Sequence, residues 1–469
     1  MQEQSVITRT VRAAPGVLAP GHLGELTRVI DFALVDAVLA ETGTRERRRR
    51  LLPSRVVVYF VLALALFEHC SYGAVWGSLT AGLGGLCPAR PAASSLCRAR
   101  RRVGAAPLRE LFGALAGPVG LPGQPGVSYR GLRTVAVDGT LLHAPDDPAV
   151  TGRYPRRAGQ WREFGYPLVR LAVLIECGTR AVLAAAFGPE TAGELAYARP
   201  LLAALSPRML LLADAGFDAA AFLRDVSMTG AGFLVRSAAT RCPTPLEHLP
   251  DGSYLARLGY GVLPALIQAR IIEAEVTITL ADGTARTEQW RLLTSLTDHA
   301  RHPAAELVAL YHERWQAETA YYSIKATILD GRVLRSRSPA GLDQEIWALL
   351  AAYQALIRAA ADTAATRPGL DTDRISLTIV LRTARNLVIN AAGILPDDPA
   401  DLAGEIGRAA LAALLPAWRR PRTRPRTRKN PVSKYSPRTA TTPPAPSQAY
   451  TFRAAITFFA EGLAARART

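Results

Sequence analysis

Apolar residues recur at helical spacing in the first quarter of the chain. The pattern covers residues 23–39, 56–67 and 108–115. It predicts an N-terminal helical domain, residues 1–116. The run at 56–67 is shorter than the roughly 20 residues of a membrane-spanning helix, so it predicts a buried helix. Glycine and proline then become frequent and predict a linker, residues 117–130.

After the linker, short apolar runs replace the helical pattern. They predict, in chain order, strands and helices at 134–137, 169–176, 181–187, 191–205 (helix), 209–213, 217–228 (helix) and 232–235. The order β-β-β-α-β-α-β predicts the first part of an α/β core, residues 131–236. Two alternating segments, 271–280 and 286–296, flank an Ala-Asp-Gly-Thr turn and predict a hairpin within a β-rich insertion, residues 237–303.

Helical spacing returns at residue 304 and continues to about residue 361, with a further helix at 375–392. It predicts the second part of the core, residues 304–400. A basic C-terminal region, residues 401–469, follows. Within it, residues 419–438 hold nine Arg or Lys, several prolines and no acid, which is typical of an extended or disordered segment.

The charge balance narrows the class of partner. The chain of 469 residues has a formal net charge of +17, which indicates a polyanionic partner, nucleic acid first. Arginines cluster at residues 45–50 and 98–102 of the helical part; DNA contact and a solvated face explain these clusters about equally well. Of 56 Lys and Arg residues only three are lysine, and Lys325 is the only one in the first 428 residues.

Cysteine usage bears on the compartment. The five cysteines are scattered, form no C-x-x-C pair and have no histidine cluster beside them, which argues against a structural zinc site. The pattern fits a reducing environment, and the start of the chain lacks a signal-peptide pattern. We expect a cytoplasmic protein.

Two aspartates each follow a short apolar run. Asp138 comes after Val-Ala-Val, and Asp214 comes after Leu-Leu-Ala. The carboxyl ends of strands in an α/β domain are where functional side chains gather, so both are candidate site residues. Either aspartate alone is as easily explained by a turn or a helix cap.

A third group of polar residues is more specific. Tyr311, Arg314, Glu318 and Lys325 stand at offsets of 0, 3, 7 and 14 residues. At about 100° per residue they lie within about 60° on one helix face. A salt-bridged surface helix explains the Arg314–Glu318 pair. It does not explain why the one lysine before the tail lies on the same face.

These four residues match the pattern Y-x2-R-x3-E-x6-K, and the chain thereby resembles insertion-sequence transposases of the insertion-sequence-4 family. Asp138-Gly-Thr140 resembles the first aspartate motif of that family, and Asp214-Ala-Gly-Phe217 resembles the second. The resemblance covers roughly residues 20 to 365.

The resemblance implies an α/β ribonuclease-H-like catalytic core interrupted by the β-rich insertion, with a basic C-terminal tail and with residues 1–116 as an N-terminal helical DNA-binding domain. It also implies a nucleoid-associated bacterial protein. It implies that Asp138, Asp214 and Glu318 are the catalytic residues and metal ligands. Carboxylate oxygens suit two Mg²⁺ ions, for which Mn²⁺ is an expected substitute. We expect DNA contacts from Tyr311, Arg314, Lys325, Trp290, Arg236 and Thr140.

The expected function is metal-dependent cut-and-paste transposition by phosphodiester hydrolysis and strand transfer. The expected partners are double-stranded DNA, as the element's terminal inverted repeats and the target, and a second copy in a synaptic homodimer. Two alternatives stay open: a two-metal nuclease without strand transfer, and an inactive element-derived DNA-binding protein. Trp290 has two interpretations, a ring that stacks on a flipped base during a hairpin step or a side chain packed in the core.

Overall fold

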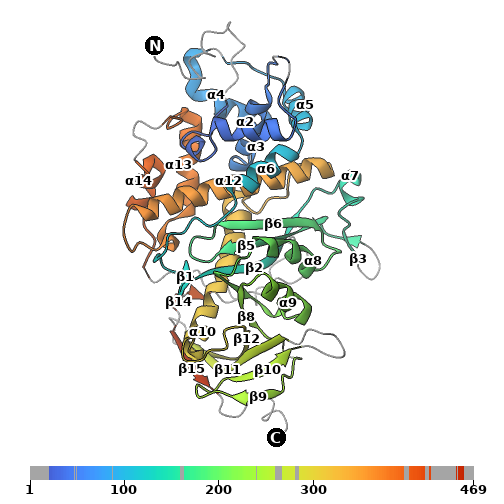
Figure 1. Ribbon diagram of the computed structural model, residues 1–469. Helices are drawn as coiled ribbons and strands as arrows, with labels where there is room; N and C mark the ends of the chain where they lie inside the picture. Colours follow the sequence, from blue (N-terminus) through green and yellow to red (C-terminus); the bar gives the residue numbers. More distant parts are fainter. Residues whose placement is uncertain are drawn as a thin grey trace, which may run out of the picture.

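In the computed structural model, a helical layer packs on one end of a large mixed β-sheet (Figure 1). The structure describes residues 21–46, 48, 50–86, 88–158, 163–238, 240–258, 267–279, 285–395, 401–417, 422–423, 450–451 and 453–458. No helix within these ranges combines the length and the apolar character needed to cross a bilayer.

The N-terminal helices are arranged around one buried helix. They are α2 (Phe32–Glu41), α3 (Ser54–Leu66), α4 (Tyr72–Thr80), α5 (Ala93–Val103) and α6 (Ala106–Leu115), with 3₁₀ turns at Leu26–Arg28 and Ala81–Leu86. The apolar run forms α3, in which every residue except Arg55 is buried. The prediction of a buried helix is therefore confirmed. Asp31 and Ser71 begin α2 and α4 as N-caps, each accepting a backbone N–H.

The central strands of the sheet come from the first part of the predicted core. Their order is β6 (Val182–Pro189), β5 (Leu168–Glu176), β2 (Leu132–His143), β7 (Met209–Ala213) and β8 (Gly232–Arg236). β5 is antiparallel to both of its neighbours, β6 and β2, whereas β2, β7 and β8 are parallel. The predicted sequence of strands and helices is confirmed, although β2 is longer than expected.

Antiparallel strands extend this sheet beyond β8. They are β12 (Ala285–Thr294), β11 (Ile267–Thr279), β10 (Tyr254–Leu258) and β9 (Pro245–His248). The predicted hairpin is formed by β11 and β12, in register from Arg270–Thr294 to Thr279–Ala285. β15 (Arg453–Phe458) pairs with residues 274–279 of β11, so the C-terminal part of the chain returns to the middle of the sequence (Figure 1). The remaining strands are short: β1 (Ser128–Tyr129), β3 (Arg157–Ala158), β4 (Glu163–Phe164), β13 (Arg422–Thr423) and β14 (Tyr450–Thr451).

Alternating side chains bury both faces of the sheet. Val135, Val137 and Leu211 pack toward α8 (Glu194–Ala198), the 3₁₀ turn Arg199–Ala204 and α9 (Ala220–Met228). Ala136, Leu210 and Leu212 belong to a second hydrophobic cluster on the other face. That cluster continues without a break into the N-terminal helices, so the sheet and the helical layer share one core.

The segment after residue 304 is helical but not one regular helix. α10 (Ala304–Tyr311) passes through a 3₁₀ turn (His312–Arg314) into α11 (Trp315–Tyr322), and a π-helical turn (Ser323–Ile328) follows. The prediction of helical structure from residue 304 to about residue 361 is therefore confirmed in part: the pitch changes at these two turns, and residues 329–338 are not helical. α12 (Pro339–Ala365) then runs along the helical layer, and it is followed by a 3₁₀ turn (Thr372–Arg374), α13 (Leu377–Asn390) and α14 (Gly404–Ala412).

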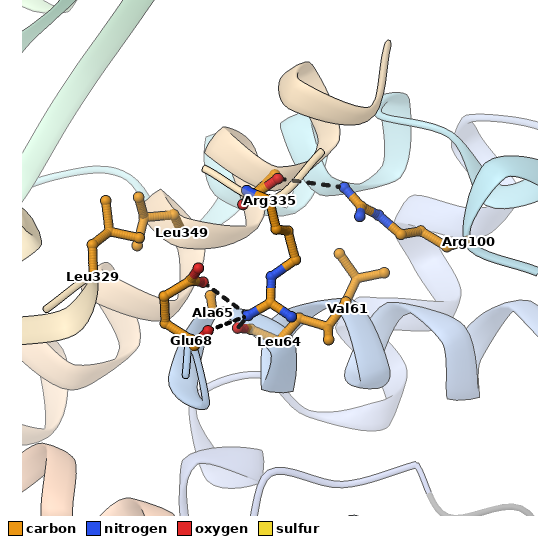
Figure 2. A pocket seen from close by; sticks show the side chains of 9 residues that line it. Val61, Leu64, Ala65, Glu68, Arg100, Leu329, Arg335 and Leu349 are labelled. Carbon is orange, nitrogen blue, oxygen red and sulfur yellow. Dashed lines mark hydrogen bonds and ion pairs between the residues drawn. The ribbon is translucent and has the colours of Figure 1, made fainter. Parts of the chain in front are cut away.

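A buried polar network fastens the N-terminal helices to the segment before α12 (Figure 2). Arg335 donates to backbone carbonyls at the end of α3, among them those of Leu64 and Glu68, and to the Glu68 carboxylate at 3.0 Å. Arg100 on α5 is 5% exposed and donates to Gln344 on α12. Because Arg100 is buried in this network, it cannot contribute to the DNA contact considered for the arginines at residues 98–102.

Candidate active site

Asp138 lies within β2, so the prediction that it follows the end of its strand is wrong. The parallel pairing of β2 with β7 ends at Ala136, however, while pairing with β5 continues to His143. Asp138 is therefore two residues past the end of the parallel pairing, at the carboxyl edge of β7. One of its carboxylate oxygens accepts the N–H of Gly139 at 2.8 Å.

Asp214 directly follows β7, as predicted, and begins a 3₁₀ turn as its N-cap. Its Oδ1 accepts the N–H of Gly216 at 2.9 Å. Because β2 and β7 are parallel neighbours, the two aspartates reach the same edge of the sheet.

Glu318 comes to this edge from α11, paired with an arginine. Arg314 Nη2 lies 3.1 Å from Glu318 Oε1, and Arg314 Nη1 lies 3.8 Å from Asp138 Oδ2. The Arg314 side chain is 12% exposed. It thus bridges two acids from distant parts of the chain.

The three predicted acids line one cavity of about 550 Å³. Lys325 and Thr140 line it too, with the Lys325 Nζ 3.2 Å from the Thr140 hydroxyl. Sequence reasoning missed two further lining residues, Tyr322 and Arg332. Both are exposed, and neither belongs to the motif that led to the others.

Asp138 is a buried acid with other acidic side chains, Asp214 and Glu194, near it. Burial raises the pKa of Asp138 to about 7, against the attraction of Arg314 and the Gly139 N–H. Asp214 and Glu194 raise the pKa of Asp138 further. A cation beside Asp138 would favour its ionised form.

The donor chemistry fits a divalent metal of the hard class, since all three acids offer carboxylate oxygens. Among the described residues, no three His, Cys, Asp or Glu side chains are already arranged as a metal site. Of these three acids, Asp138 and Glu318 are both contacted by the Arg314 guanidinium.

Tyr311 and Trp290 lie outside the cavity wall and pack on each other. Their ring centroids are 5.3 Å apart at an angle of 79°. Trp290 is 8% exposed, and the Arg236 guanidinium lies 5.5 Å from its ring centroid. Of the two interpretations of Trp290, this arrangement corresponds to the side chain packed in the core. A base could reach the ring only if Arg236 or Tyr311 moved, and the base-stacking role stays a prediction.

Two supporting residues were also missed. The buried Tyr321 hydroxyl donates to the backbone carbonyl of Asp138 and accepts the N–H of Val173 at 3.1 Å, which fixes β2 against α11. Glu194 lies over Gly139, where a Cβ would meet its Oε1 at 1.9 Å. Burial and the nearby Asp214 raise the pKa of Glu194. Neither residue belongs to a recognisable motif, and only the folded contacts reveal them.

Two protein-family models match this chain. A family model described as insertion element 4 transposase N-terminal matches residues 20–113, and one described as transposase DDE domain matches residues 129–355. The second match contains Asp138, Asp214 and Glu318.

Individual proteins are also similar to this chain. "Transposase InsG for insertion sequence element IS4" from Escherichia coli (strain K12) is 28% identical over 422 residues, which is 88% of this chain and 93% of that protein. "Putative transposase InsZ" from the same organism is 30% identical over 140 residues, or 30% of this chain and 47% of that protein. A solved piggyBac transposase synaptic complex with hairpin DNA aligns with 82% of this chain and 84% of its own, at 10% identity and a TM-score of 0.42. The two family models and the full-length relative together establish that the chain belongs to the insertion-sequence-4 family of DDE transposases.

Proposed function

We propose that this transposase cuts and joins DNA in the cavity lined by Asp138, Asp214 and Glu318, with these acids as its catalytic residues. One observation carries the proposal. The three acids come from β2, from the turn after β7 and from α11, yet they line a single cavity together with Lys325. Convergence of distant acids on one cavity supports a shared chemical role.

Transposase DDE domains depend on divalent metal ions. We propose two Mg²⁺ ions, replaceable by Mn²⁺, with Asp138, Asp214 and Glu318 as the residues that would hold them. Bound there, such ions supply Lewis-acid activation of the attacking oxygen and stabilisation of the leaving oxygen.

The other residues of the site hold the DNA and the acids in place. Lys325, positioned by Thr140, offers a compact positive charge to a backbone phosphate in the cavity. Arg314 exchanges part of its contact with Asp138 and Glu318 for DNA phosphate, and Tyr311 supports it from behind at 5.9 Å. Arg236 contacts DNA from the end of β8.

The strand arrangement supports a ribonuclease-H-like core. Three antiparallel strands, β6, β5 and β2, are followed in the sheet by the parallel strands β7 and β8. In the proposed core Asp138 lies on the first long strand, Asp214 follows the fourth and Glu318 lies on a later helix. Strands β9 to β12 then form the insertion between Asp214 and Glu318.

The proposed partners follow from this chemistry. Excision and insertion require the protein to bind the terminal inverted repeats of the element and a target duplex, and pairing of two ends favours a homodimer in the synaptic complex. A hairpin intermediate is one route to second-strand cleavage in this proposal.

The test uses charge-removing variants of the same shape: Asp138→Asn, Asp214→Asn and Glu318→Gln. Loss of a residue that only supports a metal ligand costs about 10- to 100-fold, so each variant should lose more than about 100-fold in strand cleavage and keep end binding. Glu190→Gln is the matched control, since it removes an acid that pairs with Arg157 outside the cavity.

Cleavage and strand transfer are measured on labelled element ends with Mg²⁺. Near wild-type cleavage by any variant would remove that residue from the site. Cleavage without any joined product would favour a nuclease, and end binding by the wild-type protein without cleavage would favour an inactive DNA-binding protein.

A further inference from the structure

Tyr322 is an exposed aromatic side chain in the wall of the catalytic cavity. It is 59% exposed and lines the cavity with Asp138, Asp214 and Glu318. Among the Phe, Tyr and Trp side chains whose burial the structure describes, only Tyr322 and Tyr166 are exposed. Tyr166 also lies near this cavity, because its ring is 6.0 Å from that of the lining residue His143.

The residue before Tyr322 is buried, so the end of α11 is not exposed on all sides. Tyr321 is 5% exposed and supports the Asp138 backbone from within the core. Successive residues of a helix differ in direction by about 100°, so α11 presents one tyrosine to the sheet and the next to the cavity. Tyr322 also stands four residues after Glu318, which places both on one side of α11.

The surroundings of Tyr322 match the chemistry of a nucleotide. Lys325 and Arg332 line the same cavity and offer positive charge to phosphates. An aromatic ring beside cations binds the other half of a nucleotide, because every base has a face on which a ring can stack. Trp290, the aromatic residue suggested by the sequence, is less suited as the protein stands, since Arg236 and Tyr311 cover its ring.

We propose that Tyr322 stacks on an unpaired base of the DNA end held in the cavity and so fixes the phosphate next to that base. The inference rests on the proposed function and adds the residue that positions the substrate. Tyr322 touches DNA in this proposal and takes no part in proton transfer. Its ring is needed, and its hydroxyl is not.

The experiment uses a pre-cut element end that carries 2-aminopurine at the unpaired position beside the cut. Binding is followed in EDTA, so that no strand is cleaved, by anisotropy for affinity and by 2-aminopurine fluorescence for stacking. The variants are Tyr322→Ala, Tyr322→Phe and Tyr322→Lys. Met228→Ala is the control, because Met228 is an 82% exposed side chain on α9 outside the cavity.

The wild-type protein and Tyr322→Phe should quench the fluorescence. Tyr322→Ala should lose the quenching and bind about 5- to 100-fold more weakly. Tyr322→Lys should recover affinity without quenching, which separates stacking from charge. Thermal unfolding of each variant should match the wild type, since the side chain is exposed.

Equal quenching and affinity in Tyr322→Ala and Met228→Ala would overturn the inference. The proposed function would survive that result if Asp138→Asn still abolished cleavage. If Asp138→Asn, Asp214→Asn and Glu318→Gln all cleaved normally, the proposed function would fail regardless of the fluorescence result.

Discussion

Lys325 allows a test of whether the cavity requires an ammonium group or accepts any positive charge. Its ammonium donates to the Thr140 hydroxyl from a half-buried position, in a chain that otherwise uses arginine almost throughout. A guanidinium is larger, planar and less able to sit at one compact point. We expect Lys325→Arg to lower the cleavage rate at least about tenfold, or about 1.4 kcal/mol of barrier.

End binding and single-turnover cleavage measured together would check this prediction. Thr140→Val is the companion variant, since it removes the hydroxyl that positions the ammonium and should lower cleavage in the same direction. An arginine variant that cleaves at the wild-type rate would show that the lysine is interchangeable.

Some residues of the site could be predicted and others could not. Glu318 and Lys325 were found because helical spacing places a set of polar groups on one face, and this relation holds within one element. Helical spacing puts Tyr322 on the side of α11 that carries Glu318, but it does not state which of the adjacent Tyr321 and Tyr322 is buried against the sheet. The distinction depends on how α11 packs against the sheet.

At the scale of elements, the order of strands was predictable and their ends were less so. The apolar run before Asp138 suggested a strand that stops there, yet β2 continues to His143. Pairing with β5 provides backbone hydrogen-bond partners to this extension, in which Gly139, Thr140 and His143 interrupt the apolar pattern. The 3₁₀ turn before α11 and the π-helical turn after it could not be predicted either, because the chain keeps roughly helical spacing through both turns.

The contact between α3 and the segment before α12 predicts a pH dependence of stability. Burial raises the pKa of Glu68 to about 7, although Arg335 opposes the shift and Glu345 adds to it. Between pH 4.5 and about 7 the folded protein therefore keeps a proton that the unfolded chain releases. The free energy of unfolding should fall as pH rises through this range, by on the order of 3 kcal/mol.

We expect Glu68→Gln to flatten this fall, because an amide fills the same space without ionising. Denaturant unfolding at several pH values measures the effect. Glu110→Gln is the control, as that acid pairs with Arg109 on the protein surface. If Glu68→Gln retained the full wild-type pH dependence, another group would have to be responsible.

For the whole molecule, the basic stretch at residues 419–438 remains a prediction, since only Arg422–Thr423 of it belongs to the described residues. Deletion of all residues from Arg419 onward would not test the role of this stretch in DNA binding alone, because β15 follows the stretch and pairs with β11. Such a deletion would remove part of the sheet as well as the charge.

Neutralising the six Arg and Lys residues between 424 and 438 separates the two effects. We expect weaker DNA binding with little sequence preference, and a salt dependence flatter by about 0.9 per lost phosphate contact. Thermal stability should stay unchanged, whereas truncation before β15 should lower it. A loss of affinity confined to the element's own ends, seen in binding titrations against random duplex, would mean that the stretch reads sequence.

The pairing of β15 with β11 also has a consequence for synthesis of the chain. Roughly 170 residues separate the two strands, from Thr279 to Arg453. At about 5–20 residues per second a ribosome needs about 10–30 s to make them. Throughout that interval the half of β11 that β15 will cover has an open edge, which is the kind of surface on which nascent chains pair wrongly. Synthesis of β15 is therefore the step that covers this edge of β11.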